Sequence, residues 1–235
     1  MNSIPPKQEL IRQLFDDISP TYDFLNHLLS AGIDRSWRKK TIRMLEKKTL
    51  FSILDMATGT ADLAVEAAMS FPGAKVTGID ISEKMIEIAR KKVIKAGLDG
   101  RIRVETADGE NLPFPGESFD AVTIAFGIRN FESVTCGLNE IFRVLKKNGM
   151  LVVLEFSNPK STLLRKMYWL YFTGVLPFIG KIISGNRSAY SYLPESVKEF
   201  PSGEEFLRLL VQSGFTETSC TPLSCGIASI YKGVK

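Results

Sequence analysis

Short apolar stretches alternate with amphipathic ones between residues 51 and 157, and this alternation constrains the fold more than any other feature of the chain. The apolar stretches are predicted strands: "FSILDM", "AKVTGID", "RIRVETAD", "FDAVTIAFG" and "MLVVLEFS". Amphipathic stretches such as "SEKMIEIARKKVIKAG", with Ser82 as its N-cap, are predicted helices. Strands joined by crossover helices form a parallel sheet with helices on both faces, so the pattern predicts an α/β fold.

The two ends of the chain differ from this middle part. Helices are predicted over residues 1–49, where they would form an N-terminal lid over a core at 50–160. Residues 161–200 form an apolar insertion, and residues 201–235 supply a helix and a pair of strands. The added strands bring the predicted sheet to seven, mostly parallel, and the 235 residues are predicted to form a single domain.

Two segments are candidates for contact with a membrane surface. The uncharged run Met167 to Gly180 contains Pro177 and has 14 residues, whereas a transmembrane helix needs about 20, so we expect no membrane span. This insertion is interpreted equally as a substrate- or membrane-facing surface and as ordinary core or dimer interface. Seven basic residues against one acid lie between Arg35 and Lys48. That run predicts a solvated helix face, with an anion- or membrane-attracted patch as the alternative.

Composition and charge argue against several classes of protein. The chain is 44% hydrophobic and 24% charged, which is the balance of a globular protein. A net charge of +4 and the lack of an aromatic and basic RNA motif argue against a nucleic-acid partner. The three cysteines lack metal-ligand spacing and the N-terminus lacks a secretory signal, so we expect a cytoplasmic protein without a structural metal.

Acidic residues end three successive predicted strands. Asp55 closes the first, Asp80 ends the second and Asp108 ends the third. A single aspartate after a strand is more often a turn or helix-cap residue. Because ligands of open parallel sheets bind at the carboxyl ends of the strands, three such acids in succession predict a ligand site.

The loop "DMATGTAD" after the first strand indicates which ligand the site holds. A dinucleotide loop needs three glycines for the close approach of a pyrophosphate, and this loop has only Gly59. S-adenosyl-L-methionine has no phosphate, so it is preferred over NAD as the cofactor. Asp55 would lie beside its amino-acid tail, and Asp80 would accept its ribose hydroxyls. Asp108 and the backbone of Gly109 would meet the adenine.

Several stretches of the chain are similar to one known family. They are "FDDISPTYDFLNHLLSAGIDRSW", "LDMATGTAD", "LPFPGESFDAVTIAFGIRN", "RVLKKNGMLVVLEFS" and "YLPESVKEFP", and together they cover almost the whole length. These stretches resemble the ubiquinone/menaquinone biosynthesis C-methyltransferases, which methylate a ring carbon of a polyprenylated quinol with S-adenosylmethionine. The resemblance implies the class I S-adenosylmethionine-dependent methyltransferase fold, which is Rossmann-like, with the core at 50–160 binding the cofactor.

Carried over by position, the cofactor contacts of that family fall on Thr60, Asp80, Asp108 and Gly109. Ile81, which follows Asp80, is expected at the same site. The chain also departs from the family pattern in three places.

The first departure is Leu25, where methionine is usual, and this change conserves volume. The second is Asp34, where histidine is usual, and it removes a polar contact expected near the quinol. The third is "KKNG" at 146–149, where "KPGG" is usual, and we expect its effect to be structural because it lies between a helix and a strand.

The resemblance also implies which residues act on the substrate. Arg129, in "FGIRN", is expected to orient water or stabilise a developing phenolate, although pairing of Arg129 with an acid of the lid is the alternative. Asn130 is expected to bind ring oxygens. Tyr22 and Asp23 are expected to close the lid across the cofactor, whereas the residues alone would assign Tyr22 to the core. His27, the single histidine, is a base by type, but its helical position favours a structural role.

The predicted function is methylation of demethylmenaquinol to menaquinol in respiratory quinone biosynthesis. A benzoquinol of ubiquinone synthesis, or another apolar phenolic or sterol substrate, is the alternative within the same class. A non-catalytic adenosylmethionine-binding scaffold is the alternative of another class. The expected partners are a polyprenyl quinol and the inner face of the membrane, and the choice between a monomer and a homodimer stays open.

Overall fold

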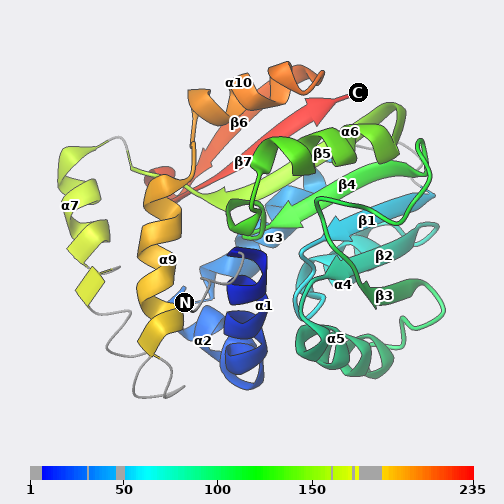
Figure 1. Cartoon of the computed structure of the whole chain (residues 1–235), viewed down its shortest axis with the longest axis horizontal. Helices are drawn as coiled ribbons and strands as arrows, with labels where there is room; N and C mark the ends of the chain where they lie inside the picture. Colours follow the sequence, from blue (N-terminus) through cyan, green and yellow to red (C-terminus); the bar gives the residue numbers. More distant parts are fainter. Residues whose placement is uncertain (1–6, 31, 46–50, 160, 171–172, 175–186) are drawn as a thin grey trace, which may run out of the picture.

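The structure, a computed structural model, describes residues 7–30, 32–45, 51–159, 161–170, 173–174 and 187–235. Its centre is a seven-stranded sheet in the order β3-β2-β1-β4-β5-β7-β6 (Figure 1). The strands are β1 (Ser52–Met56), β2 (Lys75–Asp80), β3 (Ile102–Thr106), β4 (Phe119–Ala125), β5 (Leu145–Phe156), β6 (Thr216–Leu223) and β7 (Ala228–Val234). Neighbouring strands from β3 to β5 are parallel, whereas β7 is antiparallel to β5 and to β6. The predicted α/β fold with a mostly parallel sheet is confirmed.

Helices connect the strands and cover the sheet. The α-helices are α1 (Lys7–Ile18), α2 (Tyr22–Leu29), α3 (Ile33–Arg43), α4 (Asp62–Ser70), α5 (Glu83–Lys95), α6 (Val134–Val144), α7 (Thr162–Leu170), α9 (Arg187–Glu199) and α10 (Glu204–Gln212). Short 3₁₀ turns are η1 (Ser19–Thr21), η2 (Ile128–Asn130) and η4 (Ser224–Gly226). Ser82 caps α5 as predicted, because its hydroxyl accepts the backbone N–H of Met85 at 3.1 Å.

The strand β5 shows why the sheet is covered on both sides. Met150, Val152 and Leu154 pack into one hydrophobic cluster with α3, α4 and α5. Leu151 and Val153 pack into a second cluster with α6 and α10. Consecutive side chains of a strand point to opposite faces of the sheet. An unbroken apolar run is therefore buried on both faces, as the sequence predicted.

The N-terminal helices lie at the carboxyl ends of the parallel strands. In Figure 1, α1 stands between α9 and α5, and contacts join α1 to both of these helices. Helix α3 continues from this lid onto the sheet, where it contacts α4 and β5. The lid therefore closes the edge of the sheet at which a ligand of such a fold binds.

The segment "KKNG" does not form the connection that the sequence predicted. Strand β5 begins at Leu145, directly after α6, so residues 146–149 belong to the strand. Asn148 takes the left-handed conformation with φ +61°, and the pairing of β4 with β5 shifts register at its start. A Cβ on Gly149 would lie 2.7 Å from the carbonyl oxygen of Lys146, which explains why this position is a glycine. The departure from the family pattern is accommodated as a bulge within the sheet.

The insertion and the basic run are described only in part. Most of the run Met167 to Gly180 lies outside the described residues, and α7 and α9 bound this part of the chain. Among the described residues, no helix is both long and apolar enough to cross a membrane. The basic run is not one solvated face, because Arg38 is only 8% exposed, while Lys47 and Lys48 lie outside the described residues. Its other basic residues are exposed: Arg35, Lys39, Lys40 and Arg43.

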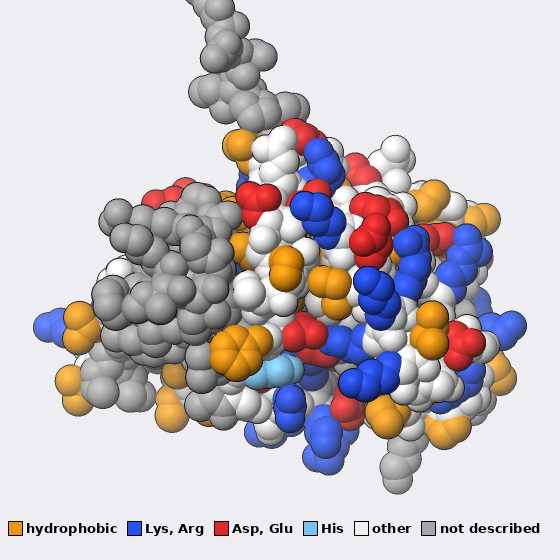
Figure 2. All heavy atoms as spheres, turned by 90° about the horizontal axis from the view of Figure 1, so that it is seen from below, with side chains coloured by type: hydrophobic (Ala, Val, Ile, Leu, Met, Phe, Trp, Pro, Cys, Tyr) orange, Lys and Arg blue, Asp and Glu red, His pale blue; other side chains and the backbone are white. Residues whose placement is uncertain are grey.

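The lower side of the molecule, where α2 and α5 lie in Figure 1, mixes acidic and basic side chains (Figure 2). Scattered apolar side chains lie among them. Opposite charges on neighbouring elements form ion pairs there, of which Lys92 on α5 with Asp23 on α2 is one, at 2.6 Å. Contacts between charged groups therefore contribute to the attachment of the lid to the core.

Replacement of Gly137 by alanine tests the packing of α6. An added Cβ would lie 2.3 Å from the ring of Phe131, although Gly→Ala in an exposed helix gains about 1 kcal/mol. Overpacking costs about 1 to 3 kcal/mol, so we expect a net loss in the free energy of unfolding, measured by denaturant titration. Gly73→Ala is the control, because nothing lies within 4 Å of its added Cβ. A gain in stability for Gly137→Ala would contradict this packing.

Candidate functional site

A cavity of about 690 Å³ lies between the lid and the carboxyl ends of the strands, and we call it the strand-end cavity. It brings together most of the residues predicted from the sequence: Tyr22, Gly59, Asp80, Ile81, Asp108, Gly109 and Asn130. These residues come from the lid and from the segments that follow β1, β2, β3 and β4.

Asp80 connects two loops at the floor of this cavity. One carboxylate oxygen accepts the N–H of Gly59 at 2.8 Å, and the other accepts the N–H of Ser82 at 2.9 Å. Burial raises the pKa of the Asp80 carboxyl, and these backbone amides oppose the rise. A carboxylate has about four acceptor sites, so beyond the backbone amides of Gly59, Ile81 and Ser82 a site remains for a hydroxyl of a ligand.

The segment after β3 lines the strand-end cavity and packs closely against its walls. Asp108 accepts the N–H of Glu110 at 2.8 Å, which fixes the turn. A Cβ on Gly109 would lie 2.8 Å from the ring of Phe131 and 3.1 Å from the methyl group of Met56. Any side chain at position 109 would therefore displace the walls of the cavity.

Asp55 lies behind the loop, in a separate small cavity of about 320 Å³ that we call the loop cavity. Its side chain is 1% exposed and accepts the hydroxyls of Thr58 at 2.6 Å and Thr123 at 2.7 Å. Burial raises the pKa of Asp55 to about 6, and these hydroxyls oppose the rise. The loop cavity is also lined by Thr60, Asp62, Arg38 and Tyr22, among others.

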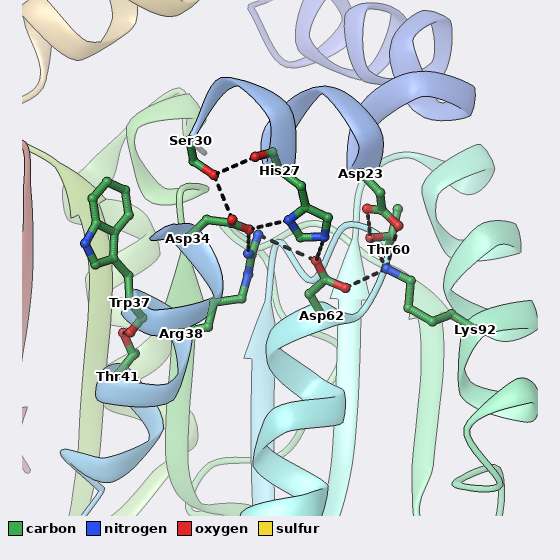
Figure 3. Close-up of polar contacts among 10 residues, drawn as sticks. All are labelled: Asp23, His27, Ser30, Asp34, Trp37, Arg38, Thr41, Thr60, Asp62 and Lys92. Carbon is green, nitrogen blue, oxygen red and sulfur yellow. Dashed lines mark hydrogen bonds and ion pairs between the residues drawn. The ribbon is translucent and has the colours of Figure 1, made fainter. Parts of the chain in front are cut away.

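Thr60 turns its hydroxyl toward the lid (Figure 3). The hydroxyl donates to Asp23 at 2.5 Å and accepts from the ammonium group of Lys92 at 2.9 Å. Lys92 also bonds the carboxylates of Asp23 and Asp62, each at 2.6 Å. This network joins α2 to the loop, to α4 and to α5, and it holds Tyr22 where it lines both cavities. The predicted contact of Thr60 with the cofactor stays a prediction.

His27 belongs to the same network and lines none of these cavities. Its Nδ1 lies 2.8 Å from the carboxylate of Asp34, and its Nε2 lies 4.0 Å from that of Asp62 (Figure 3). The three residues offer ligand atoms within 4.8 Å of one another, as a metal site would. Arg38 already bonds Asp34, and Lys92 already bonds Asp62, so cations of the protein itself neutralise these acids. The arrangement favours the structural role for His27 over the catalytic one.

A third cavity of about 720 Å³, the aromatic cavity, adjoins the strand-end cavity. The two share Phe15, Tyr22 and Phe126 as walls. Arg129 lines the aromatic cavity, whereas its neighbour Asn130 lines the strand-end cavity. The two residues predicted to be catalytic therefore lie on either side of the boundary between the cavities.

Arg129 pairs with a residue that the sequence analysis missed. Its side chain is 6% exposed, and its Nη1 lies 2.8 Å from the carboxylate of Glu155, which is completely buried. The guanidinium also lies over the ring of Phe156, with its carbon 5.5 Å from the ring centroid. The alternative that Arg129 pairs with an acid of the lid is wrong, since Glu155 lies near the end of β5. Glu155 could have been singled out from the sequence by this position, because it is an acid near the end of a strand, as the three aspartates are.

Helix α9 supplies two more residues that the sequence analysis missed. The hydroxyl of Tyr192 donates to the side-chain oxygen of Asn130 at 3.1 Å. The Nε of Arg129 donates to the hydroxyl of Ser196 at 3.3 Å. Both lie in the stretch "YLPESVKEFP", which resembled the family, but no chemistry was assigned to it. Helix α9 therefore orients both residues at the boundary.

Solved structures share this fold. The [4+2]-cyclase SpnF matches with a TM-score of 0.74 at 17% identity, over 99% of this chain and 97% of that chain. A SAM-dependent methyltransferase from Thermotoga maritima matches with a TM-score of 0.65 at 21% identity, over 95% of this chain and 99% of that chain. The predicted class I methyltransferase fold is confirmed, and the presence of a cyclase shows that the fold alone does not decide the reaction.

Relatives of higher identity are methyltransferases by name. The ubiquinone/menaquinone biosynthesis C-methyltransferase UbiE of Geobacter sulfurreducens is 47% identical, over all of this chain and 92% of its own. The demethylmenaquinone methyltransferase of Bacteroides fragilis is 44% identical, over 97% of this chain and 94% of its own. Residues 4–235 match the model of the ubiE/COQ5 methyltransferase family. The chain therefore belongs to the ubiE/COQ5 methyltransferase family.

Proposed function

We propose that this enzyme methylates a ring carbon of a polyprenylated quinol, with demethylmenaquinol as the preferred substrate. The observation that carries the proposal is the pair of cavities with shared aromatic walls, Phe15, Tyr22 and Phe126. One cavity is lined by the strand-end acids and the other by aromatic rings and Arg129. The methyl donor and the quinol react to form a single new bond, so the cavities that hold them must be in contact.

S-adenosylmethionine is the cofactor of this methyltransferase, and the strand-end cavity fits it. The carboxylate of Asp80 can accept a ribose hydroxyl beside its backbone amides, and Asp108 and Gly109 line the same cavity, where an adenine ring would lie. When bound, the cofactor supplies an electrophilic methyl group. The protein positions the two reactants and excludes water from between them.

Arg129 is the residue proposed to act on the quinol oxygen. Glu155 and Ser196 hold its Nη1 and Nε, and its Nη2 has no hydrogen-bond partner among the described residues. An arginine in a protein does not accept a proton, so Arg129 stabilises the oxygen as the hydroxyl proton leaves. Loss of that proton to solvent water raises the electron density at the neighbouring ring carbon. That carbon forms the new bond to the methyl group as the bond from the methyl group to sulfur breaks, and it then releases its own ring hydrogen as a proton to water, which restores the aromatic quinol.

The relatives' names support the choice of substrate and also its alternative. The Bacteroides fragilis relative is named for demethylmenaquinone, whereas the Geobacter sulfurreducens relative is named for both ubiquinone and menaquinone. A benzoquinol is therefore the second candidate substrate.

The surface of α7 supports a peripheral contact with the membrane that holds the polyprenyl tail. Leu163 and Leu170 are 70% and 73% exposed, which is unusual for leucine in a globular protein. Arg165 and Lys166 are exposed beside them. Apolar and basic side chains on one short helix match an interfacial contact with anionic lipid.

Assay of the purified enzyme with both reduced, demethylated quinols tests the proposed function. We expect transfer of label from methyl-labelled S-adenosylmethionine to demethylmenaquinol at a higher kcat/KM than to the benzoquinol. The oxidised quinones are the matched controls and should not react, because they have no hydroxyl proton to lose. Cofactor binding without turnover of either quinol would instead support the scaffold.

Substitution of Arg129 by lysine separates catalysis from cofactor binding. Lysine keeps the charge beside buried Glu155, so the fold should survive, but one ammonium cannot replace the fork of the guanidinium. We expect kcat to fall about 100-fold, as for the loss of one oxyanion donor, with the Kd of S-adenosylhomocysteine within twofold. Arg103→Lys, at an exposed arginine of β3, is the control. Equal losses in turnover and cofactor affinity would assign Arg129 to the cofactor site.

The raised pKa of Asp55 predicts a pH-dependent affinity. In the free enzyme this carboxyl titrates at about 6, and an ammonium group of the cofactor in the loop cavity would favour its ionised form. Binding therefore releases a proton near pH 6, and affinity for S-adenosylhomocysteine should rise from pH 5 to pH 7 and then level. Calorimetry in buffers of different ionisation enthalpy measures both effects. Affinity that stays flat over this range would place the ammonium away from Asp55, and Asp55→Asn should abolish the rise.

A further inference from the structure

Arg38 is a buried cation that the function described so far does not use. Its side chain extends from α3 and bonds the carboxylate of Asp34, and its Nη2 lies 3.7 Å from the carboxylate of Asp62 (Figure 3). The guanidinium carbon lies 6.0 Å from the ring centroid of Phe126. Arg38 lines both the loop cavity and the aromatic cavity.

Without Arg38, the charged side chains that line the cofactor site would all be acidic. Among the described residues that line the strand-end cavity there is no lysine or arginine, and the charged ones are Asp80, Asp108 and Glu110. The described lining of the loop cavity holds Asp55 and Asp62, and Arg38 is its cation. A ligand that carries a carboxylate needs a cation or a set of N–H donors, because a buried carboxylate without partners is costly.

The amino-acid tail of the cofactor carries both an ammonium and a carboxylate. We propose that Arg38 binds this carboxylate in the loop cavity, an assignment that rests on S-adenosylmethionine being the cofactor. Asp55, in the same cavity lining, then faces the ammonium. The guanidinium suits this role because its planar fork matches a carboxylate with two parallel hydrogen bonds.

Backbone N–H groups at the start of α4 are the competing donors. The N–H of Ala64 already bonds the carboxylate of Asp55, and the N–H of Ala61 already donates to the carbonyl oxygen of Thr58 at 2.9 Å. Those two amides therefore hold the loop itself. The side chain of Arg38 keeps donors beyond the one that it gives to Asp34.

Asp34 positions Arg38 from outside the lining of the loop cavity. One of its oxygens accepts the hydroxyl of Ser30 at 2.7 Å, and the other is shared between His27 and Arg38. Asp34 is 3% exposed and is not part of the described lining of the loop cavity. An arginine braced in this way loses little further freedom when it binds, which favours affinity.

Two ligands that differ only in the carboxylate test the proposal by calorimetry. S-adenosylhomocysteine has the full tail, and its decarboxylated analogue keeps the ammonium alone. We expect wild-type enzyme to bind S-adenosylhomocysteine at least tenfold more tightly than the analogue, as for a lost charge-assisted hydrogen bond. Arg38→Met should lose this preference to within twofold, mainly through weaker binding of S-adenosylhomocysteine. Arg35→Met, on the exposed side of the same helix, should keep it.

A second variant distinguishes a loss of carboxylate binding from a folding defect. Arg38→Met leaves buried Asp34 without its cation, so the double variant Arg38→Met with Asp34→Asn removes both charges together. Its melting temperature should stay near that of wild type, and its ligand preference should be lost as in the single variant. A double variant that still prefers S-adenosylhomocysteine tenfold would overturn the proposal. Failure of wild-type enzyme to bind either ligand would overturn the cofactor assignment instead, and this proposal with it.

Discussion

The carboxylate of Asp80 is the contact on which the rest of the site depends. It accepts the backbone amides of Gly59 and Ser82, and so it joins the loop after β1 to the loop after β2. Both loops follow parallel neighbouring strands, which places their amides within reach of one side chain. A rigid edge of the sheet results, and the lid closes against it. Removal of that carboxylate would release two loops as well as a ligand contact.

Ion pairs between the lid and this edge position Tyr22 and Asp23. Lys92 reaches from α5 to the lid and to the start of α4, and its partners are buried enough for the pairs to be screened less than surface pairs. Arg38 and Asp34, both on α3, form a similar group within the lid. The network contains three aspartates, one lysine and one arginine around His27, so its charges nearly balance. That balance explains how so many ionised groups lie together at the seam between lid and core.

The strands, the parallel order and the strand-end aspartates could be predicted because their signals are local. The apolar residue types of a run such as residues 150–154 indicate that the run is buried, and an acid directly after a predicted strand can be placed at the end of that strand from the sequence alone. Arg38 and Lys92 could not be found in that way, because their roles depend on partners elsewhere, whereas Glu155 was missed although its place at the end of β5 carried the same signal as the aspartates. Lys92 meets Asp23 across 69 positions, and Arg129 meets Glu155 across 26. The bulge at "KKNG" was missed because its cause is a register shift between two strands.

The shared walls of the two large cavities have a consequence for how such an enzyme can change its substrate. A substitution at Phe15, Tyr22 or Phe126 alters the cofactor cavity and the aromatic cavity together. Substitutions that change the preferred quinol ring are therefore confined to residues that line only the aromatic cavity, such as Trp37, Phe156 and Tyr192. Specificity in this architecture evolves on the side away from the methyl donor, while the boundary between the cavities stays constrained by the reaction.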